Sequence, residues 1–175
     1  MSHGPDRSFP PALAAALAVS FEYDDGKGVD FEPFPAFLSR AETTDWLRSW
    51  TGNPAVDGDA FRVFGRDGTG GYAAFWMLQE HQPLTGQPVV FLGSEGETGV
   101  VARDLGAFLW LLAGGYGPWE AATSYEPGWT ARSNHELTVV AEQFAADCRL
   151  PAPDVLAQAA REFPHFDDFA LALCR

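Results

Sequence analysis

Hydrophobic residues in the middle of the chain come in four short runs that are rich in β-branched and aromatic side chains. The runs are Phe61 to Phe64, Tyr72 to Leu78, Pro88 to Leu92 and Gly99 to Ala102. Clusters of Gly, Asp, Pro and Thr separate them, which is typical of strands joined by turns. Because the connections are short, we expect neighbouring strands to run antiparallel. In the second run, a period of two sends Phe75 to one face of the sheet and Tyr72 and Trp76 to the other.

Two helices and an acidic loop are predicted before this sheet. Pro11 can occupy the first position of a short N-terminal helix, since apolar residues follow it at helical spacing. Thr43 or Thr44 can cap a second helix, which Gly52 ends. Between the two helices, residues 21–32 carry turn sequences and many carboxylates, so we interpret them as an acidic loop.

Helical patterns dominate the chain after the sheet. Asp104 is placed to cap a helix from Leu105 to Ala113, whose apolar stripe would cover one face of the sheet. Beyond Trp119 the composition becomes that of a connector. Ser133 and Glu136 then form a capping-box pattern that predicts a firm helix start. Prolines divide the remaining sequence into three apolar stripes, which either wrap the sheet or take part in a homodimer interface.

These elements define an α+β fold, a mainly antiparallel sheet packed by helices, with extra C-terminal helices. The chain has 175 residues and 46% hydrophobic content, which suits one compact domain. We therefore predict an α+β domain over residues 1–121 and a C-terminal helical extension over residues 122–175 that packs on the same domain.

The charge balance favours a basic partner over nucleic acid or membrane. The chain has 24 Asp and Glu residues against 11 Lys and Arg, a formal charge of −13. This charge opposes binding to phosphate backbones and to anionic lipid. We find no apolar run long enough to span a bilayer. The two cysteines, Cys148 and Cys174, lie in apolar stretches, which predicts buried reduced thiols and a cytoplasmic setting.

Sequence motifs for catalysis, cofactors and metals are not convincing. Residues 65–71 contain four glycines but lack the Lys and Ser or Thr of a phosphate-binding loop. We interpret them as a hairpin turn in which Asp67-Gly68 takes positive φ and Gly70-Gly71 allows close approach. Residues 93–96 lack the first glycine of a nucleophile elbow, and the four histidines have no metal-ligand spacing. We therefore predict no catalytic residue, no cofactor and no metal.

Carboxylates in two segments are the candidate partner-binding residues. They are Asp24, Asp25, Asp30 and Glu32 of the acidic loop, with Glu95 and Glu97 of a glycine-rich turn. The loop lacks the ligand order of a calcium-binding EF-hand. Its carboxylates alternate with phenylalanines, a mixture that suits a surface bearing Arg or Lys. Alternatively, Glu95 and Glu97 form an acid and base pair in a small-molecule enzyme.

The order of these segments resembles the SUKH superfamily of Smi1/Knr4-like proteins. The resemblance covers about residues 37–119: the Arg62-Val63-Phe64-Gly65 strand, the turn from Asp67 to Tyr72, the strand and turn from Pro88 to Gly96, and the helix around Phe108 to Leu112. It implies an α+β domain without fixed catalytic residues. Bacterial members are largely immunity proteins that bind and neutralise toxins, many of them nucleases, and others are intracellular scaffolds. No binding residue carries over.

The leading hypothesis is a non-enzymatic protein-binding module. It would be an immunity protein that blocks a basic toxin domain, such as a nuclease, by steric cover and electrostatic steering. An intracellular scaffold or regulatory protein is the second hypothesis. A small-molecule-binding enzyme that uses Glu95 and Glu97 is the third.

Overall fold

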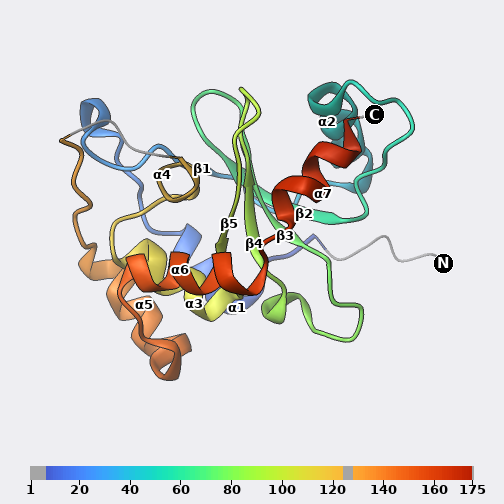
Figure 1. Ribbon diagram of the computed structural model, residues 1–175. Coiled ribbons are helices and arrows are strands. Elements are labelled where there is room, and N and C mark those ends of the chain that lie inside the picture. The colour runs from blue at the N-terminus through green and yellow to red at the C-terminus, as the bar shows by residue number, and fades with distance from the viewer. Residues whose placement is uncertain (1–6, 124–127, 175) are drawn as a thin grey trace.

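The centre of the protein is a five-stranded antiparallel sheet (Figure 1). The computed structural model describes residues 7–123 and 128–174. The strands are β1 (Glu32–Pro33), β2 (Phe61–Arg66), β3 (Tyr72–Trp76), β4 (Val89–Leu92) and β5 (Thr98–Ala102). They lie in the order in which they occur along the chain, each antiparallel to the next. The four strands predicted from sequence are confirmed, and β1 is an addition.

Helices surround the sheet, so the predicted α+β class is confirmed. They are α1 (Pro11–Leu17), α2 (Arg40–Thr51), α3 (Leu105–Ala113), α4 (Pro118–Ala122), α5 (His135–Ala145), α6 (Ala152–Glu162) and α7 (Phe166–Leu173). Three short 3-10 turns, η1 (Asp24–Gly26), η2 (Leu84–Gly86) and η3 (Ala146–Cys148), complete the elements of the described residues. In Figure 1, α1, α3, α5 and α6 lie on one side of the sheet, and α2 and α7 lie on the other.

The two faces of the sheet bury two separate hydrophobic clusters. Phe75 and Ala73 of β3 join the cluster that contains residues of α1, α3 and α5. Ala74 and Trp76 join the cluster formed with α2 and α7. The predicted alternation along β3 is therefore confirmed, and it explains why both faces of this strand are apolar.

Strand β2 contains a β-bulge, and its consecutive residues Val63 and Phe64 face opposite cores. The register between β2 and β3 shifts between Val63 and Gly65, so Phe64 has no directly paired residue on β3. Val63 belongs to the α2 side and Phe64 to the α3 side. The Phe31 ring lies so close to Gly65 that a β-carbon there would collide with it. Gly65 thus allows β1 and its preceding loop to pack on β2.

Two helix caps differ from the sequence prediction. Ser39, not Thr43 or Thr44, caps α2, and it forms a reciprocal capping box with Glu42. Asn134, not Ser133, caps α5 by accepting a hydrogen bond from the amide of Leu137. In both cases the sequence near the helix start contains several residues that can act as caps. The observed cap lies one or more residues before or after the predicted Ser or Thr, because the packing of the helix decides where it starts. Asp104 caps α3 as predicted.

The C-terminal helices contribute to both cores. Leu137, Ala141 and Val155 belong to the α3 side, whereas Phe166 and Ala170 belong to the α2 side. The prediction of buried cysteines is wrong, because Cys148 and Cys174 are both free and exposed. Each follows an apolar stripe but lies at its helix end. Within the described residues, no helix has the length and hydrophobicity needed to cross a membrane.

Candidate functional site

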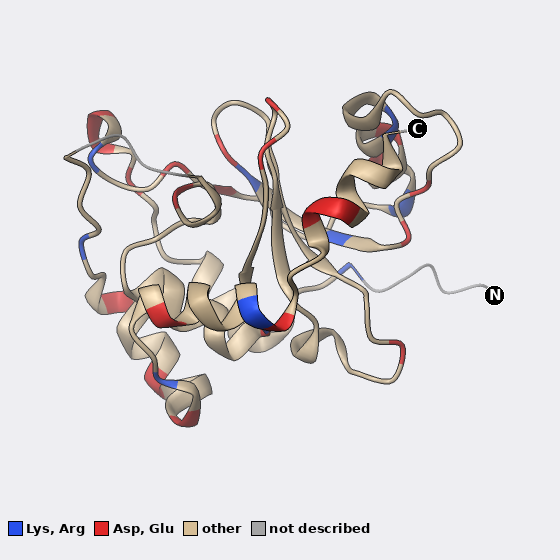
Figure 2. Cartoon of the chain, viewed as in Figure 1, with Lys and Arg blue, Asp and Glu red and all other residues tan. Residues whose placement is uncertain are grey.

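Carboxylates from several loops gather at one end of the sheet. The β2–β3 turn contacts the acidic loop, because the amide of Gly68 donates to Oδ1 of Asp30 at 2.8 Å. It also contacts the β4–β5 turn, where Ser94 Oγ donates to Thr69 Oγ1 at 2.8 Å. Figure 2 shows acidic residues on these turns and on the loop that contains η1. We call this region the acidic end; its members are Asp24, Asp25, Asp30, Glu32, Asp67, Glu95 and Glu97.

The six partner-binding candidates all lie in this region, but Asp24 and Asp25 on the η1 loop stand apart from Glu95 and Glu97 on the β4–β5 turn (Figure 2), and their environments differ. Asp24 and Asp25 are exposed and have positive φ angles of 48° and 51°. Asp24 pairs with Arg132 at 2.9 Å, and Glu32 pairs with Arg66 at 3.2 Å across β1 and β2. Both pairs are exposed to solvent, where such pairs contribute little to stability.

The two glutamates of the β4–β5 turn differ in exposure and in hydrogen bonding. Glu95 is exposed. Glu97 turns back, and its Oε2 accepts a hydrogen bond from the amide of Glu95 at 3.1 Å. Trp50 of α2 supports the turn by donating from Nε1 to the carbonyl of Gly93 at 2.6 Å. Glu97 therefore shapes the turn, and Glu95 presents its charge to solvent.

Asp67 organises the β2–β3 turn from a buried position. This residue is only 1% exposed. Oδ1 accepts hydrogen bonds from the amides of Thr69 and Gly71, at 3.1 and 2.7 Å. The hairpin-turn interpretation holds, but the conformation differs from the prediction: positive φ occurs at Gly70, not at Asp67-Gly68. Gly71 allows the predicted close approach, to the Phe91 ring and the backbone of Gly93.

Glu120 of α4 is a buried carboxylate that sequence reasoning did not single out. It is 1% exposed, and its Oε1 accepts a hydrogen bond from the amide of Asp30 at 2.5 Å. Its Oε2 is buried and has no hydrogen-bond partner among residues 7–123 and 128–174. A buried oxygen without a donor costs free energy. Among the described residues, Oε2 is the one buried side-chain oxygen or nitrogen without a hydrogen-bond partner.

The start of α4 fixes the position of Glu120. Gly117 is the N-cap and Pro118 occupies the first helical position, which sets the helix start and places Glu120 in the first turn. A β-carbon on Gly117 would lie 2.5 Å from Glu120 Oε2 and 2.5 Å from Val29 Cγ1. Glycine is needed here because the carboxylate and the acidic loop both approach the backbone closely.

Burial raises the proton affinity of both Glu120 and Asp30. Burial raises the pKa of Glu120 to about 7; the amides of Asp30 and of Glu120 itself oppose the shift, and the charges of Asp30 and Asp67 add to it. Burial also raises the pKa of Asp30, against the hydrogen bond from Gly68 and with the charge of Asp67. Glu120 is thus divided between its neutral and charged forms near pH 7.

A cavity of about 650 Å³ lies over these carboxylates. We call it the Glu120 pocket. Its wall is formed by residues of the acidic loop between Tyr23 and Asp30, by Thr69, by Trp119 and Glu120, and by Gly128, Trp129, Thr130 and Arg132. Trp129 is anchored to the loop, since its Nε1 donates to the carbonyl of Gly28 at 3.3 Å. Of the six predicted residues, Asp25 and Asp30 line this pocket; the other four do not.

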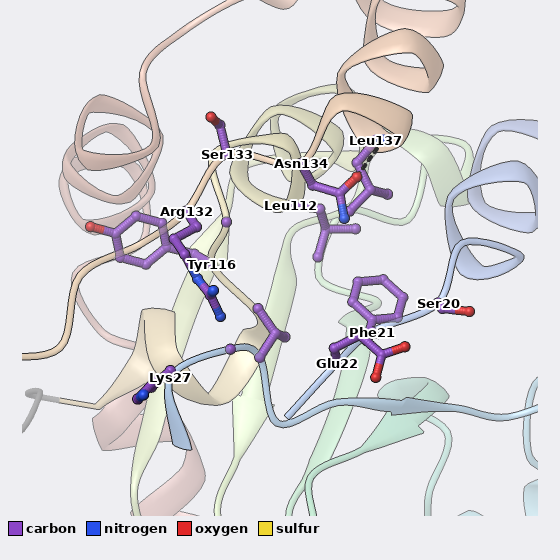
Figure 3. A pocket seen from close by; sticks show the side chains of 13 residues that line it. Ser20, Phe21, Glu22, Lys27, Leu112, Tyr116, Arg132, Ser133, Asn134 and Leu137 are labelled. Atoms are coloured by element: carbon purple, nitrogen blue, oxygen red, sulfur yellow. Dashed lines mark hydrogen bonds between the residues drawn. The ribbon is translucent and has the colours of Figure 1, made fainter. Parts of the chain in front are cut away.

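A second, smaller cavity of about 380 Å³ shares Lys27, Gly28 and Arg132 with the Glu120 pocket. Figure 3 shows Arg132 alongside the ring of Tyr116 and shows Phe21 near Leu112. A dashed line in this view marks the cap of α5, from Asn134 to Leu137. Lys27 and Arg132 therefore stand between the two cavities, with Arg132 held by Asp24.

Burial, not residue type, distinguishes Glu120 from the other carboxylates. The local signal that could have located it is Gly117-Pro118, a pattern typical of a helix start, with Glu120 in the following turn. The sequence does not indicate that Asp30 would lie against it. In the described part of the chain, no group of three or more His, Cys, Asp or Glu side chains can hold a metal ion. The side chains that line the pocket include carboxylates, aromatic rings and the two cations Lys27 and Arg132.

Comparisons with known proteins add no family assignment: no family model, no curated protein and no solved structure matches the chain. The resemblance to SUKH proteins stays a prediction from the sequence pattern.

Proposed function

We propose that the protein is a non-enzymatic protein-binding module, an immunity protein that blocks a basic toxin domain by covering its substrate groove. The observation that carries the proposal is the acidic end. Carboxylates from three separate segments meet there, joined by the Gly68–Asp30 and Ser94–Thr69 hydrogen bonds. A contiguous surface of one charge sign is what electrostatic recognition of a basic protein requires.

Charge pairing leaves this surface predominantly negative. Arg66 and Arg132, two of the cations at the acidic end, are already paired with Glu32 and Asp24. Asp25 and Glu95 are exposed and take part in none of the ion pairs that join described residues. Together with the formal charge of −13, these features support attraction of a basic partner and disfavour an anionic one.

Hydrogen bonds hold the two turns of the acidic end in place, which suits binding of a partner without a large rearrangement of these turns. Asp67 holds the β2–β3 turn by three donors, two amides and the Thr69 hydroxyl. Trp50 and Glu97 hold the β4–β5 turn. Preorganised turns reduce the entropy lost on association. A toxin domain would therefore meet charges that are already in place.

We expect a gene beside that of this protein to encode a basic toxin domain, and the test uses that domain. The association rate should fall as the salt concentration rises from about 50 to about 300 mM, because screening weakens long-range attraction. Asp25→Asn and Glu95→Gln should slow association, whereas Asp154→Asn on α6, which removes the same charge outside the acidic end, should not. A salt-independent association rate would contradict electrostatic steering. Failure to inhibit the toxin in a co-expression assay would remove the immunity role.

A scaffold or regulatory role is the remaining alternative and predicts a different partner. Pull-down of a stable complex with a basic cellular protein, together with the lack of any toxin gene nearby, would favour that alternative. The same acidic-end variants would then weaken the scaffold complex.

A further inference from the structure

The Glu120 pocket combines a negative floor with aromatic walls. Its volume of about 650 Å³ lies within the range of about 300 to 1,000 Å³ that is usual for sites of small ligands or single side chains. Asp30 and Glu120 line the floor, and Tyr23, Trp119 and Trp129 contribute aromatic rings to the lining. The pocket is thus more than a cluster of acids on a surface.

Oxygen Oε2 of Glu120 is a buried acceptor that no described residue satisfies. Oε1 is occupied by the amide of Asp30, while Oε2 is buried without a donor from any of the described residues. By contrast, the neighbouring buried Asp67 is satisfied by Thr69 and Gly71. The two buried carboxylates differ in this respect although they stand close enough to raise the pKa of Glu120. A hydrogen-bond donor from a ligand would complete Glu120.

The charges around the pocket determine the sign of that ligand. Asp25, Asp30 and Glu120 line it, together with Lys27 and Arg132. Arg132 is bound to Asp24 at 2.9 Å, so its charge is offset at the rim. An anion would face Glu120 and Asp30 directly, whereas a cation would relieve their mutual repulsion. The carboxylates of the lining therefore favour a cation over an anion beside Glu120 and Asp30.

The aromatic walls favour a planar cation. Trp129 is fixed by its hydrogen bond to Gly28 and by an edge contact with Tyr116, with ring centroids 5.4 Å apart. A guanidinium group stacks on indole rings and forms two parallel hydrogen bonds with a carboxylate, which a lysine ammonium cannot do. A lining that contains both indole rings and carboxylates thus matches guanidinium better than ammonium.

We propose that the Glu120 pocket binds a guanidinium group, with Glu120 and Asp30 as its anionic partners and Trp119 and Trp129 as its aromatic walls. The source of the group in the cell is an arginine side chain of the basic partner, and in that respect the inference rests on the proposed function. A free guanidinium compound has the same chemistry and is separated from a protein arginine by the experiment.

The experiment records amide and indole NMR signals of the full chain during titration. The probes are Nα-acetyl-arginine methylamide, an arginine-containing basic peptide, and the same peptide with citrulline in place of arginine. Both arginine probes should shift the indole signals of Trp119 and Trp129 and the amide signal of Thr69. Citrulline keeps the shape but removes the charge, so its peptide should bind about tenfold more weakly or worse.

Variants locate the site. Glu120→Gln and Asp30→Asn should each weaken binding of the arginine probes by about tenfold or more. Asp154→Asn, which removes one exposed carboxylate on α6 outside both the pocket and the acidic end, should leave probe binding unchanged within about twofold. Two pocket variants are used so that a folding defect in one does not decide the result. Equal binding to Glu120→Gln, Asp30→Asn and the unaltered protein would overturn the proposal.

The results of the titrations and of the variants also show whether the pocket assignment or the proposed immunity function has failed. Tighter binding of the peptide than of the small probe would identify a protein-borne arginine, and binding of the small probe that is as tight or tighter would identify a free guanidinium compound. Pocket binding without any complex with the toxin domain would remove the immunity role and leave the pocket assignment standing. A toxin complex that is unaffected by Glu120→Gln and Asp30→Asn, with no indole shift from either arginine probe, would remove the pocket assignment alone.

Discussion

The amide of Asp30 donates to Oε1 of Glu120 at 2.5 Å, although the two residues are 90 positions apart in the chain. This bond ties the acidic loop to α4 at the edge of the Glu120 pocket. It also orients the carboxylate so that Oε2 remains buried without a partner among the described residues. Stability, pH dependence and ligand binding are therefore linked at one side chain.

Stability should fall as pH rises through the titration of Glu120. Burial raises the pKa of this group to about 7 from an ordinary value of 4.5, so the folded state holds a proton that the unfolded state releases. The contribution is fully present below pH 4.5 and is lost as pH rises through 7. It is on the order of 3 kcal/mol in the free energy of unfolding.

Glu120→Gln provides the measurement of this effect. The variant keeps an oxygen acceptor for Asp30 but cannot titrate, so its free energy of unfolding in urea should decline less between about pH 5 and about pH 8. Glu95→Gln removes an exposed carboxylate and should follow the unaltered protein. The four histidines are common to all three proteins, so they do not affect the difference. Parallel pH profiles for Glu120→Gln and the unaltered protein would contradict the assigned burial.

Gly117→Ala should destabilise the protein through a steric clash at the same carboxylate. The added carbon would lie 2.5 Å from Glu120 Oε2 and from Val29 Cγ1, so α4 and the acidic loop would have to separate. Overpacking of this kind costs about 1 to 3 kcal/mol. The matched control is Gly86→Ala, whose new carbon would meet mainly the movable end of Gln82. Thermal or urea unfolding should show a clearly larger loss for the change at Gly117; equal losses would refute the packing argument.

Asp67→Ala should cost about 1 to 3 kcal/mol in the free energy of unfolding, because the buried amide of Gly71 loses its acceptor. Asp57→Ala is the control, since Asp57 also accepts from an amide two residues ahead, that of Asp59, but in an exposed position. Water can replace that bond, so the change should remain within about 0.5 kcal/mol. Hydrogen exchange at Gly71 should accelerate in the first variant alone. Unchanged protection there would show that the carboxylate does not hold the turn.

Elements with a local signal were predictable from sequence, and contacts between distant segments were not. Strand β3 was found because its residues alternate between two buried faces, and α3 because Asp104 precedes a long apolar run. Strand β1 has only two residues and exists through its pairing with Arg66 and Gly65. A strand so short leaves no periodic pattern to detect.

The candidate site was only partly predictable for the same reason. The acidic loop and the β4–β5 turn can be recognised from their composition, and the fold brings them to one end of the sheet. The importance of Glu120 depends on burial against Asp30 and Val29, which no local pattern encodes. A carboxylate in a sequence is usually assigned to solvent. The exceptions are recognised only when the tertiary packing is known.

Removal of the Phe166 ring tests whether the C-terminal helices are part of the folding unit. Phe166 of α7 is 2% exposed, and its ring centroid lies 4.8 Å from that of Trp76 on β3. Phe166→Ala should therefore reduce the free energy of unfolding by about 3 to 5 kcal/mol. Leu171→Ala, at a position of the same helix that is 68% exposed, should change it by no more than about 0.5 kcal/mol. Tryptophan fluorescence and circular dichroism should show one shared transition in both variants, because α7 and the sheet bury a common core. If Phe166→Ala instead released the helix in a separate early transition, with the main transition unmoved, residues 122–175 would be an appendage and not a structural part of the sheet domain.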